Sequence, residues 1–282
     1  IELSYGAKFS FIKTDSDVNY FDTTAGTPVF DATQSNAFQY KENTQSFYVS
    51  GTKKISDKWE TQLGLRLENT QTQGLSLTLN QKNKNNYTKF FPTFYITYTP
   101  DEKNSISLNY NKRINRPSYN RLNPFRWYSN PYSYVEGNPF LQPSFSNNLE
   151  LNYTFDDNWT NSVYFSHTKN GFEQLTIVDN STNIQKTVAE NFFNTSVIGI
   201  SESYTFNKLK WLSSTLSFDW SYNWAKSLIP ITNQNLKGAN AYLSISNDFI
   251  LNKNKTLLFN ISYWYNFKGV SDLDKSSAYS QL

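Results

Sequence analysis

Apolar and polar residues alternate along most of this chain. The clearest run, at 148–155, places Leu149, Leu151, Tyr153 and Phe155 between polar residues. A period of two residues is that of a β-strand with one apolar and one polar face. The pattern predicts eleven strands and the start of a twelfth, with the faces of the second and eighth left ambiguous. The predicted strands are 1–13, about 38–53, 59–70, 93–98, 106–113, 148–155, 159–178, about 182–206, 212–224, 240–249 and 257–267.

The connections between these strands alternate in length. Short turns fall near residues 56, 101, 157, 208 and 254, whereas the intervening connections, such as 14–37 and 73–89, are long and polar. Runs of about 11 to 15 residues exceed the usual five or six of globular sheets and span about 40 Å. Long strands with turns sorted by length are typical of outer-membrane β-barrels, in which the short turns are periplasmic.

Composition agrees with a barrel and excludes several other classes. The chain has 282 residues, of which 17% are aromatic and 38% hydrophobic, and its mean hydropathy is −0.63. No stretch approaches the roughly 20 apolar residues of a membrane helix. In a barrel only alternate residues face lipid, so mean hydropathy stays low. A soluble β-sandwich, such as an adhesin or a sugar-binding domain, is the competing fold, but it has no reason to sort its loops by length.

Charge and reactive side chains limit the function further. The net charge is only +3 and the basic residues are scattered, so we expect no nucleic-acid partner. Cysteine is absent, and no cluster has the spacing of metal ligands, so we expect neither a metal nor a cofactor. His167 is the only histidine, and nothing near it in sequence completes a catalytic serine–histidine site. We therefore expect no enzyme, although a serine reaching His167 in space would reopen that interpretation.

Tryptophans mark the predicted membrane interfaces. Trp59, Trp159 and Trp211 each follow a short turn, which predicts that they lie at one interface. Trp211 is the weakest of the three because its parity on the following strand is wrong for lipid. We expect an opposite girdle from Tyr222, Trp224 and Tyr265, together with Phe267.

The segment 113–143 interrupts the alternation. It holds five of the nine prolines and three Asn-Pro pairs. Proline fixes φ and lacks an amide donor, which predicts a rigid, turn-rich loop that is neither a helix nor a central strand. Either the loop packs on itself, or it meets a ligand or a neighbouring domain. The candidate contacts here are Arg113, Arg116, Tyr119, Trp127, Tyr128, Tyr134 and Glu136.

Charged residues also share the polar face of the strand 59–70. Glu60, Arg66 and Glu68 have the same parity, and Arg113 and Glu150 are predicted to lie on the inward faces of later strands. Such charges are expected on the inner face of a barrel that is filled with water or with a plug domain. They indicate either structural ion pairs, including one between Arg113 and Glu150, or contacts of Arg66 and Glu68 with a plug or a solute.

Several segments carry a family resemblance: RPSYNRLNPF, then GNPFLQP, then the strand NNLELNYTF, with GLRLENT and FPTFYITY before them. In order and spacing they resemble the outer-membrane β-barrel family common in Bacteroidetes, the barrel part of TonB-dependent receptor-like proteins. The resemblance implies an antiparallel up-and-down transmembrane β-barrel in the bacterial outer membrane. It also implies three partners beside the lipid: a plug domain of the same full-length protein, a TonB-type energising protein and a small nutrient ligand.

The number of strands separates two forms of this hypothesis. Eleven to twelve strands fall short of the roughly 22 of plugged transporters. We therefore expect residues 1–282 to be one barrel domain that is a fragment, without the plug and the final strands. The alternative is a stand-alone barrel acting as an adhesin, or as a structural or secretion component.

Overall fold

The fold is one long antiparallel sheet. The structure, a computed structural model, describes residues 1–230, 232, 235–271 and 273–282. Among these, twelve strands pair in the order β1-β2-β3-β4-β5-β8-β9-β10-β11-β12-β13-β16. Their bounds are β1 Glu2–Asp22, β2 Val29–Lys54, β3 Trp59–Ser76, β4 Gln81–Asp101, β5 Asn104–Asn115, β8 Ser144–Phe155, β9 Trp159–Asp179, β10 Ile184–Leu209, β11 Leu212–Ser227, β12 Asn235–Ile250, β13 Leu258–Asn266 and β16 Tyr279–Gln281. The prediction of an all-β meander with eleven strands and the start of a twelfth is confirmed.

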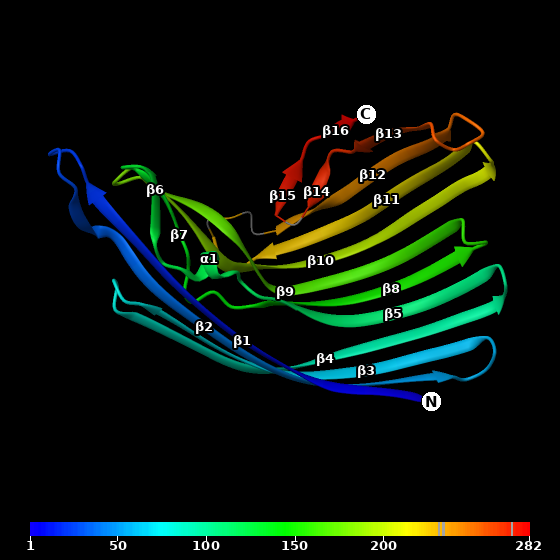
Figure 1. Ribbon diagram of the computed structural model, residues 1–282, viewed down its shortest axis with the longest axis horizontal. Coiled ribbons are helices and arrows are strands. Elements are labelled where there is room, and N and C mark those ends of the chain that lie inside the picture. Colours follow the sequence, from blue (N-terminus) through cyan, green and yellow to red (C-terminus); the bar gives the residue numbers. More distant parts are fainter. Residues whose placement is uncertain (231, 233–234, 272) are drawn as a thin grey trace.

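The sheet curls into an open trough, with β1 at one edge and the C-terminal strands at the other (Figure 1). Apolar side chains cover its convex outer face. Leu149, Phe165 and Ile198 are aligned by register across β8, β9 and β10, and each is about two-fifths exposed. A second such row crosses β11 to β13, where Leu216, Ile245 and Tyr263 are aligned. A continuous exposed apolar belt of this kind is the surface that a barrel presents to lipid.

Several strands extend further than the hydrophobic pattern predicts. The expected loop 14–37 contains the end of β1 and the start of β2, and only residues 23–28 connect them. The expected loop 73–89 is likewise reduced to residues 77–80. These polar arms pair residue by residue, yet they lie beyond the apolar belt. Because water wets them, no apolar face is required, and the alternation that marks a strand is lost.

The faces of the two ambiguous strands are now clear. On β2 the even positions Phe38, Tyr40 and Thr44 are buried, and Phe47 and Val49 point outward. On β10 the pairing with β9 shifts twice between residues 191 and 195. The first shift places an extra residue in β10 and so exchanges the faces of that strand, whereas the second places an extra residue in β9. This explains why no single parity describes the whole of β10.

The proline-rich segment folds into the concave side of the trough (Figure 1). It contains helix α1 (Tyr119–Leu122) and the strands β6 (Arg126–Asn130) and β7 (Ser133–Glu136). β7 pairs with β6 on one side and, in parallel, with residues 185–188 of β10 on the other. The expectation of neither helix nor central strand is therefore wrong for these residues. Prolines 131 and 139 flank β7 and leave its amides free to pair.

A small hydrophobic core attaches the segment to the sheet. Leu122 and Leu141 pack with Phe38 of β2, Phe172 of β9 and Ala189 of β10. Phe38 is 1% exposed and Leu141 2%. The segment thus joins strands from both halves of the sheet across the concave side.

The C-terminal region adds a separate hairpin of β14 (Gly269–Ser271) and β15 (Asp274–Ser276), and β16 pairs with β13. Asp272, in the predicted connection 269–277, lies outside the described residues, as do Ile231, Asn233 and Gln234 of the predicted loop that reaches about Gly238. No helix in the described part of the chain is long and apolar enough to cross a membrane.

Candidate lumenal cluster and mouth pocket

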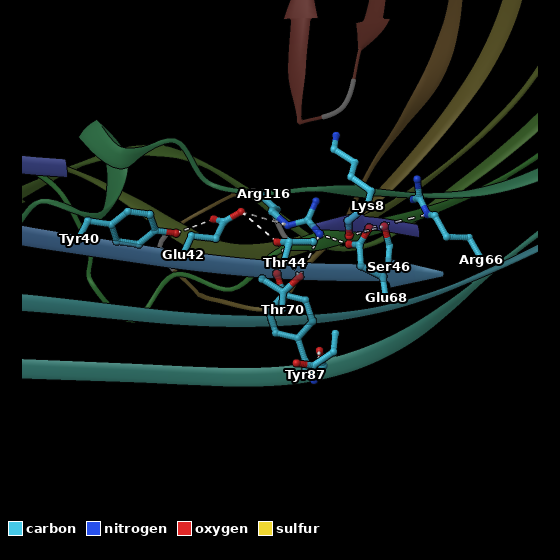
Figure 2. A network of polar contacts seen from close by, with 11 residues as sticks. Lys8, Tyr40, Glu42, Thr44, Ser46, Arg66, Glu68, Thr70, Tyr87 and Arg116 are labelled. Carbon is cyan, nitrogen blue, oxygen red and sulfur yellow. Dashed lines mark hydrogen bonds and ion pairs between the residues drawn. The ribbon is translucent and has the colours of Figure 1, made fainter. Parts of the chain in front are cut away.

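The first candidate site is a charged network on the inner wall, here called the wall cluster: Tyr40, Glu42, Arg66, Glu68 and Arg116 (Figure 2). Glu42 and Glu68 stand on the inward faces of β2 and β3, and Arg116 comes from the beginning of the proline-rich segment. Arg116 Nη2 donates to Glu68, and Arg116 Nε lies 3.9 Å from Glu42 Oε1. Arg66 Nε lies 3.7 Å from Glu68 Oε2, and the Tyr40 hydroxyl donates to Glu42 Oε2 over 2.8 Å. One guanidinium therefore links the segment to two adjacent strands.

Burial makes these contacts energetically important. The Glu68 side chain is 8% exposed and that of Arg116 26%. Arg116 Nη2 also donates to Thr70, a residue with no exposed surface, over 3.2 Å. A buried carboxylate that loses its partner is costly, so this cluster fixes the position at which the segment enters the barrel. The Arg66 guanidinium is held from its other side by the Phe91 ring, 4.6 Å away.

Two further residues predicted from the sequence lie next to this cluster. Tyr119 packs against the rings of Phe38 and Tyr40, with centroids 5.7 and 6.3 Å apart. Arg113 points inward, but its Nε donates to Asn111 over 3.0 Å. The expected pair of Arg113 with Glu150 is wrong, because Arg113 stands opposite Ser146 in register and Glu150 stands opposite Asn109, four residues away.

The second candidate site, here called the mouth pocket, is a cavity of about 440 Å³ beside the proline-rich segment. Its lining comes from the first part of β2, the β3–β4 connection, the segment itself and β10. The residues are Gln34, Ser35, Asn36, Thr78, Leu79, Gln81, Pro124, Phe125, Arg126, Tyr128, Glu136, Gly137, Asn138, Pro139, Phe140, Lys186, Val188 and Glu190. The volume is that of a small-molecule site.

Charges in the mouth pocket are mutually paired. Glu136 accepts from Arg126 Nε over 2.9 Å and lies 2.5 Å from Lys186 Nζ. Glu190 accepts from the Asn138 amide over 3.0 Å. The Arg126 guanidinium also lies 4.8 Å above the Tyr134 ring. The walls are therefore polar and close to neutral, with the half-exposed Tyr128 and the exposed Phe140 as the aromatic surfaces.

Gly137 shapes the floor of this pocket. Its amide donates to the Asn123 carbonyl over 2.9 Å, and the next amide, of Asn138, donates to the Arg121 carbonyl over 2.7 Å. A Cβ on Gly137 would collide with backbone atoms of Asn123 and Arg121. Only glycine permits this close approach of residues 137–138 to residues 121–123.

The structure divides the predicted contact residues into two groups. Arg66, Glu68, Arg116 and Tyr119 belong to the wall cluster, with Arg113 close by, whereas Tyr128 and Glu136 line the mouth pocket. Tyr134 is buried beneath Arg126, and Trp127 is half exposed outside the pocket lining, packed at 4.6 Å on Phe125.

Sequence reasoning missed Glu42, Lys186, Glu190 and Asn138. Glu42 was hidden by the ambiguous facing of the second strand, and Lys186 and Glu190 by the shifts in β10. Asn138 belongs to the third Asn-Pro pair of the segment, and this turn signal could have marked it as a candidate.

The predicted interface aromatics lie on the outer face. Trp59 and Trp159 begin β3 and β9 beside short turns, and Trp211 lies in the turn between β10 and β11. The Trp211 ring stacks on outward-facing Phe249 at 6.3 Å, so the turn, rather than strand parity, sets its orientation. At greater distance from the turns, Tyr222 contacts Trp224 at 6.1 Å and Tyr265 contacts Phe267 at 4.7 Å. Their role as membrane girdles stays a prediction.

His167 does meet a serine in space. Its Nδ1 lies 2.7 Å from Ser196 Oγ, and the two residues are register partners on β9 and β10. Ser196 is only 7% exposed, and around it β10 pairs with β9 on one side and β11 on the other. The backbone amides there are used in the sheet, so none is free to bind an oxyanion. The residue opposite His167 on β8 is Asn147, whose Oδ1 accepts from the Tyr110 hydroxyl. This contact is a cross-strand polar pair without the remaining parts of a hydrolase site. Among the described residues, no group of three or more histidines or carboxylates is placed to hold a metal ion.

Comparison with known proteins agrees with this architecture. The model of the outer membrane protein beta-barrel family matches residues 1–282, and the chain belongs to that family. It is therefore a β-barrel protein of the bacterial outer membrane. No curated protein matches the chain.

Solved structures show the same fold at low sequence identity. The copper transporter OprC matches with a TM-score of 0.62 and 11% identity, over 99% of this chain and 44% of its own. The siderophore receptor PiuA from Acinetobacter baumannii matches with a TM-score of 0.51 and 13% identity, over 94% and 48%. A chain in the FpvAI–pyocin S2 complex matches with a TM-score of 0.51 and 12% identity, over 94% and 39%. The sheet thus resembles TonB-dependent receptor barrels, and the chain spans less than half the length of each of these three.

Proposed function

We propose that this chain forms part of the barrel wall of a TonB-dependent receptor-like protein that captures a small nutrient for uptake across the outer membrane. In this proposal residues 1–282 are one barrel domain of a longer protein. That protein also supplies a plug domain, further strands and the contact with a TonB-type energising protein. The partial coverage of the matched structures supports it, because this chain spans less than half the length of each of those chains.

The mouth pocket is the observation that carries the proposal. It is of ligand size and is built from four separate parts of the chain at the end opposite the short turns. In outer-membrane barrels that end faces the cell exterior. An adhesin or a structural barrel needs no such pocket.

The test uses the full-length protein in cells that depend on it for growth on a limiting nutrient. Tyr128→Ala combined with Phe140→Ala removes both aromatic surfaces of the pocket. We expect capture and uptake to fall at least tenfold while the amount of folded barrel is unchanged. Tyr132→Ala is the matched control, because Tyr132 is 63% exposed on the same segment but outside the pocket lining. Unchanged uptake in the double variant would refute the pocket as the capture site.

A further inference from the structure

A second hollow lies on the inner wall beneath the proline-rich segment, separate from the mouth pocket. Its volume is about 460 Å³, and it is bordered by β1, β2, β3, β5 and the entry of the segment. Its charged residues are Lys8, Arg66, Arg113 and Arg116 against Glu42 and Glu68. Four cations face two carboxylates, so two positive charges are in excess.

Both carboxylates are already engaged. Glu68 is shared by Arg116 and Arg66, and Glu42 is held by Arg116 and the Tyr40 hydroxyl. Across residues 1–230, 232, 235–271 and 273–282, no carboxylate lies within ion-pair distance of Lys8 or Arg113. In Figure 2 the Lys8 amine extends away from the other labelled residues.

The engaged guanidinium groups also keep unused donors. Arg66 Nε and Arg116 Nε are buried and make no hydrogen bond, although each is within 4 Å of a glutamate oxygen. Buried donors without acceptors are costly, and a walled cavity with an excess of positive charge concentrates anions. Guanidinium groups match the two oxygens of a carboxylate in geometry.

We propose that this hollow binds a carboxylate group, with Lys8 and Arg113 as its principal partners. The carboxylate comes either from a small organic acid or from an aspartate or glutamate on another segment of the same full-length protein. This site is independent of what the mouth pocket binds.

The experiment compares three forms of the full-length protein in detergent: the wild type, the variant Lys8→Gln/Arg113→Gln, and the control Lys208→Gln/Lys210→Gln. The control removes the same charge from exposed positions at the short-turn end. Citrate is titrated against each form at constant ionic strength, and the dissociation constant and the melting temperature are measured.

Two results support the proposal, and they distinguish the two possible origins of the carboxylate. If the occupant is a solute, citrate binds and stabilises the wild type and the control, and its dissociation constant is at least tenfold weaker in Lys8→Gln/Arg113→Gln. If the occupant is a side chain of the protein, citrate does not bind, and the melting temperature of Lys8→Gln/Arg113→Gln falls below that of the control.

Two results overturn it. The first is citrate binding that is equal in all three forms, which would place the anion elsewhere. The second is no citrate binding together with a melting temperature of Lys8→Gln/Arg113→Gln equal to or above that of the control. If the hollow is empty, neutralising two unpaired cations relieves their mutual repulsion, so the melting temperature stays equal or rises.

Discussion

Arg116 offers the sharpest test of how the proline-rich segment is attached. Replacing it with methionine keeps most of the aliphatic stem but leaves Glu68, whose side chain is 8% exposed, beside only Arg66 at 3.7 Å. Breaking a buried ion pair by removing one partner costs about 3–5 kcal/mol. Arg116 is itself 26% exposed, so solvent screening lowers the expected cost to about 2–4 kcal/mol.

The assay is denaturant unfolding of the full-length protein in detergent, followed by tryptophan fluorescence. Arg121→Met is the matched control, because Arg121 lies on the same segment and pairs at 3.0 Å with Glu173, whose side chain is 57% exposed. An exposed pair of this kind contributes at most about 1 kcal/mol. Adding Glu68→Gln to Arg116→Met removes the stranded charge and should restore more than half of the loss. A cost for Arg116→Met no larger than that for Arg121→Met would refute the attachment.

Three further predictions test the segment and the loop ends. Phe38→Ala should destabilise the protein by about 3–5 kcal/mol in the same unfolding assay, because Phe38 is 1% exposed beneath the segment; a loss below about 1 kcal/mol would mean that the small core does not form. Gly137→Ala should accelerate proteolysis within residues 116–143, since its Cβ collides with backbone of Asn123, and cleavage at the wild-type rate would contradict this close approach. At the exposed β9–β10 turn, hydrogen bonds from the Ser181 side chain and backbone lower the pKa of Asp179 to about 2. A lowered pKa stabilises the turn above the ordinary carboxyl pKa of about 3.9 and loses that effect as pH falls through about 2. The carboxyl carbon of Asp179, followed by NMR in the full-length protein, should therefore titrate with a midpoint near pH 2, whereas a midpoint near the ordinary value would contradict these hydrogen bonds.

The sequence predicted the part of the fold that lipid dictates. Where a strand crosses the membrane, one face must be apolar, so residues such as Leu149, Leu151, Val163 and Phe165 reveal both the strand and its outward face. Beyond the apolar belt the same strands are wet on both faces. Residues 14–22 and 81–89 therefore carried no alternation, and the sequence predicted loops there.

The candidate sites were only partly predictable for a related reason. Arg66 and Glu68 could be paired because they are two apart on one face of one strand. Their connection to Arg116 and Glu42 depends on where a 28-residue segment returns into the trough, between the end of β5 at Asn115 and the start of β8 at Ser144. That path is determined by tertiary packing on Phe38 and Ala189. The mouth pocket depends on Lys186 and Glu190, which lie on one face of β10. The register shifts between residues 191 and 195 exchange that face, so it could not be assigned from the clearer part of the strand.

The central claim is that the chain is outer-membrane barrel wall, with its short turns in the periplasm and the proline-rich segment at the outer mouth. The most direct test uses the absence of cysteine from residues 1–282, so an introduced cysteine is unique within this part of the protein and its labelling is compared with that of the unsubstituted full-length protein. Tyr132→Cys and Lys103→Cys, at opposite ends of the sheet, are expressed in the full-length protein and treated in intact cells with a membrane-impermeant maleimide. The account predicts labelling of Tyr132→Cys in intact cells, and of Lys103→Cys only after the outer membrane is permeabilised. Labelling of Lys103→Cys in intact cells, with Tyr132→Cys protected, would contradict it.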